Sequence, residues 1–584
     1  MKNIFISVFI LLWISFGCCC HNNTEKIIVI NQSDVQKVGN SIPVSEISEP
    51  VGEVRLYSPR WIEATEINPA YAVVEGSIMP VDPEGWPINF RILLPEKWSK
   101  RSMQQGGGGM NGTITVNEGN SPILKKGFAI YGSDSGHQTS GRGFRRTVNT
   151  ETLATGPTDG DEWALNDEAI QNLAYMQMKK THDAAMVIIK RVYDAKPEYN
   201  YFVGNSQGGR EALTVAQRYP KDYDGIISNV PIVNFSTLML APILIRIQEI
   251  PKENRVSTEK IELITKEFLR QTDNLDGLSD GIISNYTVAR EIFNVNDGKV
   301  TGNPWALLRS SVNQGKGVNC VSDSAKLTDG EIKTLEFSFS SYHFTNPLAN
   351  GVKSFGMWTP IIYLNKATML VTNNRFKGQE GAGENARMYN SMGMLGVTGF
   401  LMQDLSANPL DYVEGGKWEK RRWQLSEWLD STDPDLSEFY NHGGKIIFTI
   451  GAMDYIASSG AQMDYYQSLI DVMEQDKLDK FARLYVVPNG DHSLRGKSCS
   501  ENGNGEQIEV KSLAAPNHNQ NIEMLIDWVE KDRAPAKTLV IDESGNIGTD
   551  SNVKGYLLCS YPDYQRYIGG SEDMASSYDN TSPF

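Results

Sequence analysis

Cysteine is scarce in this sequence, which limits how far disulfides can hold the fold. Six cysteines occur in 584 residues, and three of them stand together at positions 18–20. Only Cys320, Cys499 and Cys559 remain in the body of the chain, so they cannot all pair with one another. In an oxidising compartment we expect Cys499 to pair with Cys559. Three isolated thiols are the alternative.

Positively charged residues are also fewer than negatively charged ones. The chain has 55 lysine and arginine residues against 71 aspartate and glutamate residues, a net charge of −16. Such a surface repels nucleic acid and anionic lipid, so we expect no nucleic acid as a partner. A hydrophobic share of 40% is that of a globular protein. The length suffices for about two domains, or for one domain with a large insertion.

Hydrophobic runs long enough to span a membrane are absent. Lys2 and the apolar stretch Ile4 to Phe16 are typical of a signal peptide. We assign residues 1–20 to a signal peptide of the lipoprotein type and the polar residues 21–50 to a tether. We expect export, as a periplasmic or outer-membrane lipoprotein or as a secreted protein, with membrane contact only through the lipid anchor. Which cysteine carries the lipid, Cys18, Cys19 or Cys20, stays open, because Ser15 stands where a lipobox usually has leucine.

Strand and helix patterns alternate in the first part of the body. Ile88, Phe90 and Ile92 alternate with polar residues, as a half-buried strand requires. Further strands are predicted at 128–131, 199–203 and 226–230, and helices at 164–194 and 209–218. This alternation predicts a parallel α/β sheet.

The alternation stops near residue 235 and resumes with strands at 445–450 and 483–487. The simplest account is one sheet interrupted by an inserted domain. We therefore predict a core in two halves, residues 51–234 and 436–584. The insertion, residues 235–435, is predicted to be a lid domain.

A short motif marks the candidate nucleophile. Residues 204–208 read Gly-Asn-Ser-Gln-Gly and match the pattern G-x-S-x-G. Between a strand and a helix this pattern is a nucleophile elbow, which exposes the serine hydroxyl and frees the next backbone N–H. Ser206 is therefore the candidate catalytic serine. The alternative is an ordinary tight turn whose glycines serve backbone shape alone.

The partners of Ser206 in an α/β-hydrolase follow in the order acid, histidine. Asp454 and His492 each lie just past a predicted strand, at the edge where the catalytic loops of α/β sheets gather. Neutral imidazole can take the serine proton, and a carboxylate behind it fixes the tautomer. Asp491 competes for the acid role, but adjacent side chains diverge. A helix-capping aspartate and a surface histidine are the alternatives.

A glycine run at 106–109 supplies a turn for an oxyanion hole. We place this run after the strand at 88–94. Backbone N–H groups of Gly108 and Gln207 are the candidates to hold the developing oxyanion. A flexible loop is the alternative.

A second cluster of acidic residues lies in the insertion. Residues 272–283 read Thr-Asp-Asn-Leu-Asp-Gly-Leu-Ser-Asp-Gly-Ile-Ile. Asp273, Asp276 and Asp280, separated by glycine turns, can converge their oxygens on one hard cation. Carboxylates and backbone carbonyls without nearby His or Cys suit Ca²⁺ rather than zinc. Solvated turn aspartates are the alternative.

Several separate motifs, in this order, resemble the tannase/feruloyl esterase family, which includes the mono(hydroxyethyl) terephthalate hydrolases. The likeness covers roughly residues 60–575. The matching stretches are GGGGMNG at 106–112, GFAIYGSDSGH at 127–137, YFVGNSQGGREAL at 201–213, AQRYPKDYDGI at 216–226, DNLDGLSDGII at 273–283, GGKIIFTIGAMD at 443–454 and CSYPDYQRY at 559–567.

The resemblance implies an α/β-hydrolase core whose lid holds a structural Ca²⁺. It implies Ser206 as the nucleophile, Asp454 as the acid and His492 as the base. It also implies a set of calcium ligands, namely Asp273, Asp276 and Asp280 with the backbone carbonyls of Leu278 and Ile282.

The chain departs from the family at the positions of its disulfides. Family members typically have one cysteine before the nucleophile and another after the catalytic histidine, where this chain has Asn205 and Ser493. Packing and hydrogen bonds must then hold the two loops, and an Asn205–Ser493 contact is one candidate. Thr272 replaces a further family cysteine, which would leave Cys320 as an unpaired thiol.

These observations predict a secreted or lipid-anchored serine carboxylesterase. The resemblance implies aromatic acyl esters of the feruloyl or galloyl type, either small molecules or esters linked to polysaccharide. Aromatic lid residues could line an acyl pocket or could simply form the lid core; they are Phe355, Trp358, Tyr363 and Phe376, with six methionines between Met357 and Met402. A serine peptidase of the same core and a non-catalytic ligand-binding lipoprotein are the alternatives.

Overall fold

The computed structural model describes residues 27–583, apart from 120, 139–159, 294–327 and 357–394. Several predictions lie outside these residues. They are the signal peptide with its three cysteines, Cys320, and the lid residues Trp358, Tyr363 and Phe376.

The centre of the molecule is an eleven-stranded sheet with the order β15-β14-β11-β10-β8-β9-β6-β5-β3-β2, and β4 pairs with β5. The strands from β15 to β9 are parallel, and those from β9 to β2 are antiparallel. The sheet is therefore mixed, and not wholly parallel as the alternation predicts. Its strands are β2 (Ser41–Ile42), β3 (Glu53–Leu56), β4 (Arg60–Ile62), β5 (Tyr71–Met79), β6 (Ile88–Pro95), β8 (Arg101–Gln105), β9 (Phe128–Ser133), β10 (Tyr199–Asn205), β11 (Gly225–Asn229), β14 (Lys445–Gly451) and β15 (Ala482–Val487).

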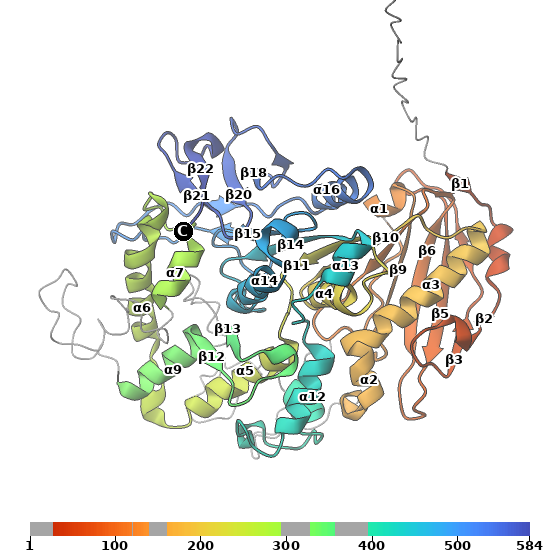
Figure 1. Ribbon diagram of the computed structural model, residues 1–584, viewed down its shortest axis with the longest axis horizontal. Helices are drawn as coiled ribbons and strands as arrows, with labels where there is room; N and C mark the ends of the chain where they lie inside the picture. Colours follow the sequence, from red (N-terminus) through yellow and green to blue (C-terminus); the bar gives the residue numbers. More distant parts are fainter. Residues whose placement is uncertain (1–26, 120, 139–159, 294–327, 357–394, 584) are drawn as a thin grey trace, which may run out of the picture.

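Helices cover both faces of this sheet. Successive residues of a strand point to opposite faces, so neighbouring residues pack against different helices. Phe202 of β10 packs with α4 (Gln207–Arg218) and α14 (Ser459–Met473), whereas Tyr201 packs with α16 (His518–Lys531) on the other face. The helix α3 (Gln177–Tyr193) lies along the antiparallel part of the sheet (Figure 1). The α/β-hydrolase layering is present.

Strand β8 was not predicted, because its sequence Arg-Ser-Met-Gln-Gln is polar. It is nevertheless buried between β10 and β9, with Ser102 and Gln104 at most 1% exposed. The side chain of Gln104 donates to the Met178 carbonyl over 3.2 Å and accepts from the Tyr223 hydroxyl. Hydrogen bonds to distant parts of the chain thus make a polar strand compatible with the core.

Residues 27–50 are not a tether, which corrects that prediction. Strand β1 (Ile28–Val29) pairs with β7 (Lys97–Trp98), and β2 joins the edge of the sheet. Val35, Val38 and Ile42 are at most 3% exposed and pack in the cluster that contains α3. Apolar side chains spaced through a polar segment bury themselves even where no long helix or strand pattern is visible.

The described part of the insertion is mostly helical, although its sequence shows no clear alternation. Its described elements gather on one side of the sheet (Figure 1). They are α5 (Phe235–Gln248), α6 (Thr258–Thr272), α7 (Tyr286–Phe293), α9 (Asp329–Phe339), α12 (Glu419–Leu429) and the hairpin of β12 (Ser341–His343) with β13 (Ser354–Gly356). Phe355 is 1% exposed and lies in a hydrophobic cluster formed mostly by residues of the insertion.

The predicted Cys499–Cys559 disulfide is wrong, since both thiols are free and buried. The backbone N–H of Cys499 donates to the Gly281 carbonyl, so this cysteine lies beside the 272–283 loop. Cys559 ends β20 (Gly555–Cys559) and packs with Ala575 and Tyr578 in another cluster. Within the described part of the chain, no helix is both long and apolar enough to cross a membrane.

Candidate active site

Ser206 lies in the sharp turn between β10 and α4. Its backbone has φ 59° and ψ −118°, a strained conformation for a residue with a side chain. A Cβ atom on Gly204 would lie 2.0 Å from the Gly208 carbonyl oxygen, and one on Gly209 would lie 2.4 Å from the Asn229 carbonyl oxygen. The flanking glycines therefore allow backbone contacts that force the serine hydroxyl outwards.

The three residues predicted as a catalytic triad lie together. His492 Nε2 is 2.8 Å from Ser206 Oγ, and His492 Nδ1 is 2.9 Å from Asp454 Oδ2. Asp454 follows β14 and His492 follows β15, which are neighbours at one end of the parallel strands. In this geometry the imidazole can accept the serine proton while the carboxylate holds its other nitrogen.

Asp454 is held rigidly and is 1% exposed. Its Oδ1 accepts from the backbone N–H groups of Ile456 and Ala457, both over 2.9 Å, and its Oδ2 accepts from Gln462 Nε2 over 3.1 Å. The following helix α14 is capped by Ser458 instead. These contacts fit an orienting carboxylate better than the helix-capping alternative.

Asp491, the competing acid, turns away from the histidine. Its Oδ1 accepts from the backbone N–H and the hydroxyl of Ser493, over 2.8 and 2.6 Å. Burial alone would lower the pKa of His492, but the Asp454 carboxylate and its hydrogen bond raise it above the ordinary histidine value. Asp454 therefore favours the imidazolium that forms when the proton moves.

The glycine turn reaches the elbow from β8, not from the strand at 88–94 as predicted. Gly107 donates its N–H to Glu211 Oε2 over 2.8 Å, and its carbonyl accepts from the Gly208 N–H over 3.0 Å. Gly108 is exposed, and a Cβ atom there would meet nothing within 4 Å. Gln207 is the first residue of α4, where backbone N–H groups have no partner within the helix.

The positions that lack the family cysteines have other partners. Asn205 Oδ1 accepts from Asn229 Nδ2 over 2.8 Å, whereas Ser493 bonds to Asp491. The Asn205–Ser493 contact considered above is therefore not formed. Thr272 donates its hydroxyl to the Phe268 carbonyl over 2.7 Å.

The acidic loop of the insertion, residues 273–283, is folded on itself and buried. Asp273, Asp276 and Asp280 are 0%, 3% and 8% exposed, so they are not solvated turn residues. Burial raises the pKa of Asp276 to about 7 and that of Asp280 to about 6, and the negative charges of the other loop aspartates add to these shifts. Such a cluster favours a cation that would neutralise it.

The oxygens of these aspartates also bind backbone N–H groups. Asp273 accepts from Gly281 and Gly503, Asp276 accepts from Leu278, and Asp280 accepts from Ile282, over 2.6–3.1 Å. Among the described residues, no three His, Cys, Asp or Glu side chains are arranged to hold a metal ion. The oxygen donors and the negative charge suit Ca²⁺, but in this structure the three carboxylates bind backbone N–H groups and are not arranged around one point.

Sequence reasoning missed Asn489, which links this loop to the histidine loop. Its side chain is fully buried and accepts from the Ile283 N–H over 2.9 Å. It donates to the carbonyls of Gly281 and Lys497, both over 2.9 Å. An asparagine three residues before a histidine carries no signal of this contact.

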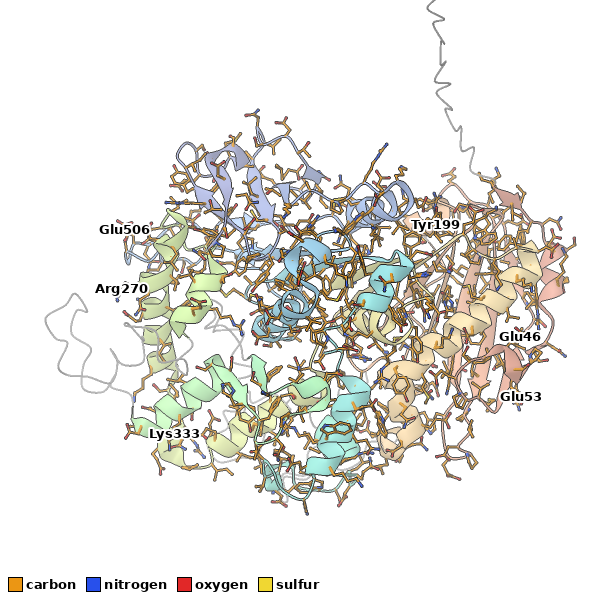
Figure 2. All side chains as sticks on the ribbon, in the orientation of Figure 1. Glu46, Glu53, Tyr199, Arg270, Lys333 and Glu506 are labelled. Atoms are coloured by element: carbon orange, nitrogen blue, oxygen red, sulfur yellow. The ribbon has the colours of Figure 1, made fainter. Side chains whose placement is uncertain are left out.

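A neighbouring segment covers the acidic loop. The Gly503 N–H reaches Asp273, and Lys266 of α6 forms an ion pair of 3.0 Å with Glu501. Arg270 near the end of α6 and Glu506 accordingly lie on the same side of the molecule (Figure 2). The insertion and the chain segment 501–506 are joined here.

Comparison with known proteins gives consistent results over most of the chain. The sequence profile described as tannase and feruloyl esterase matches residues 72–581. An uncharacterized esterase of Agrobacterium fabrum, Atu5261, is 30% identical over 92% of this chain and 91% of its own length. The mono(2-hydroxyethyl) terephthalate hydrolase of Piscinibacter sakaiensis is 25% identical over 86% and 83%.

Solved structures show the same fold. Feruloyl esterase B from Aspergillus oryzae aligns with a TM-score of 0.63 at 19% identity, over 92% of this chain and all of its own. Tannin acyl hydrolase from Aspergillus niger aligns with a TM-score of 0.59 at 18% identity, over 94% and 95%.

Proposed function

The chain belongs to the tannase and feruloyl esterase family of carboxylic ester hydrolases, and we propose that it is a serine esterase for aromatic acyl esters of the feruloyl or galloyl type. One observation carries the proposed mechanism. A continuous relay runs from Ser206 Oγ through His492 to Asp454, with hydrogen bonds of 2.8 and 2.9 Å.

The reaction follows from this relay. His492 Nε2 takes the proton of Ser206 as the oxygen attacks the ester carbonyl, and Asp454 stabilises the imidazolium. The N–H groups of Gly108 and Gln207 hold the oxyanion. The tetrahedral intermediate collapses, and the alcohol leaves with the proton from His492. Water then hydrolyses the acyl-enzyme by the same route.

The aromatic acyl group is proposed from the relatives. Two of their names specify feruloyl and terephthaloyl esters. Phe355, the described member of the predicted aromatic set, is buried in the lid core and gives no support to a pocket role.

The proposed function is tested with Ser206→Ala and a panel of feruloyl, galloyl, short-chain and p-nitrophenyl esters. We expect the variant to lose hydrolysis of every ester that the unmodified protein cleaves. Undiminished hydrolysis would overturn the assignment. Preferred cleavage of peptide amides would indicate a peptidase instead, and failure of a fluorophosphonate probe to label Ser206 would indicate a non-catalytic binding protein.

We further propose a structural Ca²⁺ at the loop of Asp273, Asp276 and Asp280, with carbonyls of Leu278 and Ile282 completing the ligands. Three buried carboxylates support this proposal. The ion would neutralise their charge and fix the loop, without a part in the chemistry.

We also propose that the protein is exported and lipidated at its N-terminus. The short apolar stretch before the cysteines at 18–20 supports this proposal. Mass spectrometry of the mature N-terminus tests it: an acylated cysteine is expected, and an unprocessed methionine would contradict export.

A further inference from the structure

A buried glutamate one turn beyond the nucleophile has no part in the reaction as described. Glu211 of α4 is fully buried, five positions after Ser206. Burial raises the pKa of its carboxyl, and Arg210 beside it offsets part of that shift. A charged group at such a place needs specific partners to be tolerated.

Three donors converge on this carboxylate. Oε2 accepts from the Gly107 backbone N–H over 2.8 Å, and Oε1 accepts from Asn111 Nδ2 over 2.6 Å and from Gln177 Nε2 over 3.2 Å. Asn111 also donates to Ser135 Oγ over 2.6 Å. The carboxylate therefore holds both ends of the short segment 107–111, which contains the glycine turn.

The same turn lies directly on the elbow. A Cβ atom on Gly106 would lie 2.7 Å from Gly208 Cα, and one on Gly208 would lie 2.7 Å from the Gly107 carbonyl oxygen. The Gly208 N–H donates to that carbonyl. Glu211 thus holds the glycine turn against helix α4 through hydrogen bonds inside the protein. Gly108, the oxyanion-hole candidate, follows Gly107 in this turn.

The three hydrogen bonds to Glu211 require its side chain to act as the acceptor. The Gly107 N–H is a donor in every protonation state, and a carboxylate can accept all three bonds. Bonds to an ionised acceptor are roughly twice as strong as neutral ones, so they fix the turn tightly.

We propose that Glu211 is a positioning residue of the oxyanion site, which fixes the Gly107–Asn111 turn so that the Gly108 N–H is held beside that of Gln207. This inference rests on the proposed function, because it assigns a role around Ser206. It predicts that loss of the carboxylate weakens binding of a tetrahedral oxyanion more than binding of a planar acid.

The test uses Glu211→Gln, which keeps the shape but places an NH₂ group among three donors. Removing one oxyanion donor typically lowers kcat by about 10²–10³. A donor that is displaced but still present should cost less. We therefore expect kcat to fall roughly tenfold, while KM changes by no more than about twofold. Phenylboronic acid and benzoate form a matched pair of inhibitors with a tetrahedral and a planar head group. Affinity for the boronate should fall by the same factor as kcat/KM, with benzoate unchanged.

Glu267→Gln is the matched control, since Glu267 is 7% exposed, bonds to Arg270 and lies in α6 of the lid. It should change none of these values. Unchanged kcat and boronate affinity in Glu211→Gln, or equal losses for both inhibitors, would overturn the inference. If this variant does not fold, Glu211→Asp is tested with the same two inhibitors. Aspartate keeps the charge, but its side chain is one methylene shorter. Loss of hydrolysis in Ser206→Ala supports the proposed function on its own, so a negative result for Glu211→Gln would then contradict only the role given to Glu211.

Discussion

At the scale of single residues, we expect His492 to set the pH range of the proposed reaction. The imidazole must be neutral to take the serine proton, and Asp454 raises its pKa above the ordinary value of about 6.5. The protonated, inactive form therefore persists to higher pH than for an isolated histidine. We expect kcat/KM to rise with pH along a limb whose midpoint lies above 6.5, as measured by a pH–rate profile.

Asp454→Asn provides the control for this profile. Loss of the orienting carboxylate in serine hydrolases lowers kcat by about 10⁴, so a large loss is expected here. Asp491→Asn should retain most activity, because Asp491 bonds to Ser493 and not to His492. An acidic limb at or below 6.5 in the unmodified protein would contradict the role assigned to Asp454.

Residues with a defined sequence context could be predicted, and residues without one could not. Ser206 stands in a motif, and Asp454 and His492 each follow a strand, so the sequence predicts that the three converge. Glu211 and Asn489 act through contacts with residues about 100 and 200 positions away. Such contacts depend on the packing of whole elements, which local pattern does not encode.

At the scale of elements, the histidine loop depends on the acidic loop through Asn489. Asn489→Ala would remove the acceptor of the buried Ile283 N–H and would break the bonds to the carbonyls of Gly281 and Lys497. Unsatisfied buried groups cost about 1–3 kcal/mol, so we expect a loss of stability of that order and a lower kcat. Urea unfolding and steady-state kinetics measure both effects. Asn519→Ala, an exposed position of α16, should change neither, and an unaffected Asn489→Ala would show that the loops are independent.

Calcium should stabilise the same region. A ligand at about 100 times its Kd stabilises the folded state by about 2.7 kcal/mol, so the melting temperature should be higher in calcium than in EDTA. Asp276→Asn should remove this difference, because it deletes one carboxylate of the loop. Equal melting temperatures of the unmodified protein in both conditions, with no calcium retained after dialysis, would reject the site.

Strand β8 shows why element prediction failed in one place. Apolar periodicity is the main signal of a strand, and the segment 101–105 is polar. Its polar side chains are satisfied by Met178 of α3, Asn200 of β10 and Tyr223 of the loop before β11. The glycine turn was consequently assigned to the wrong strand, although its place beside the elbow was expected.

At the scale of the whole molecule, the N-terminal segment is part of the core. Val35, Val38 and Ile42 pack against the helix α3 side of the sheet. Burial of such side chains contributes about 1.5–3 kcal/mol each. A chain that begins at residue 51 should therefore melt at a clearly lower temperature than one that begins at residue 27. Equal melting temperatures would show that the segment is dispensable, and calorimetry of the two chains measures this.

The fold class could be predicted from the sequence, while the full sheet could not. Parallel strands separated by helices repeat a recognisable unit. The antiparallel strands β2 to β5 lack such helices, and the segment at 27–50 lacks length and periodicity. Their place in the sheet is decided by edge pairing and burial.

The relay between Ser206 and His492 joins positions 286 residues apart, and α16 ties Glu530 to Arg101 across 429. A ribosome adds about 5–20 residues per second, so the serine is made roughly 15 to 60 seconds before its base. During this interval the chain has a nucleophile without a proton acceptor. Under the proposed mechanism, a chain that ends before residue 492 should therefore have no esterase activity.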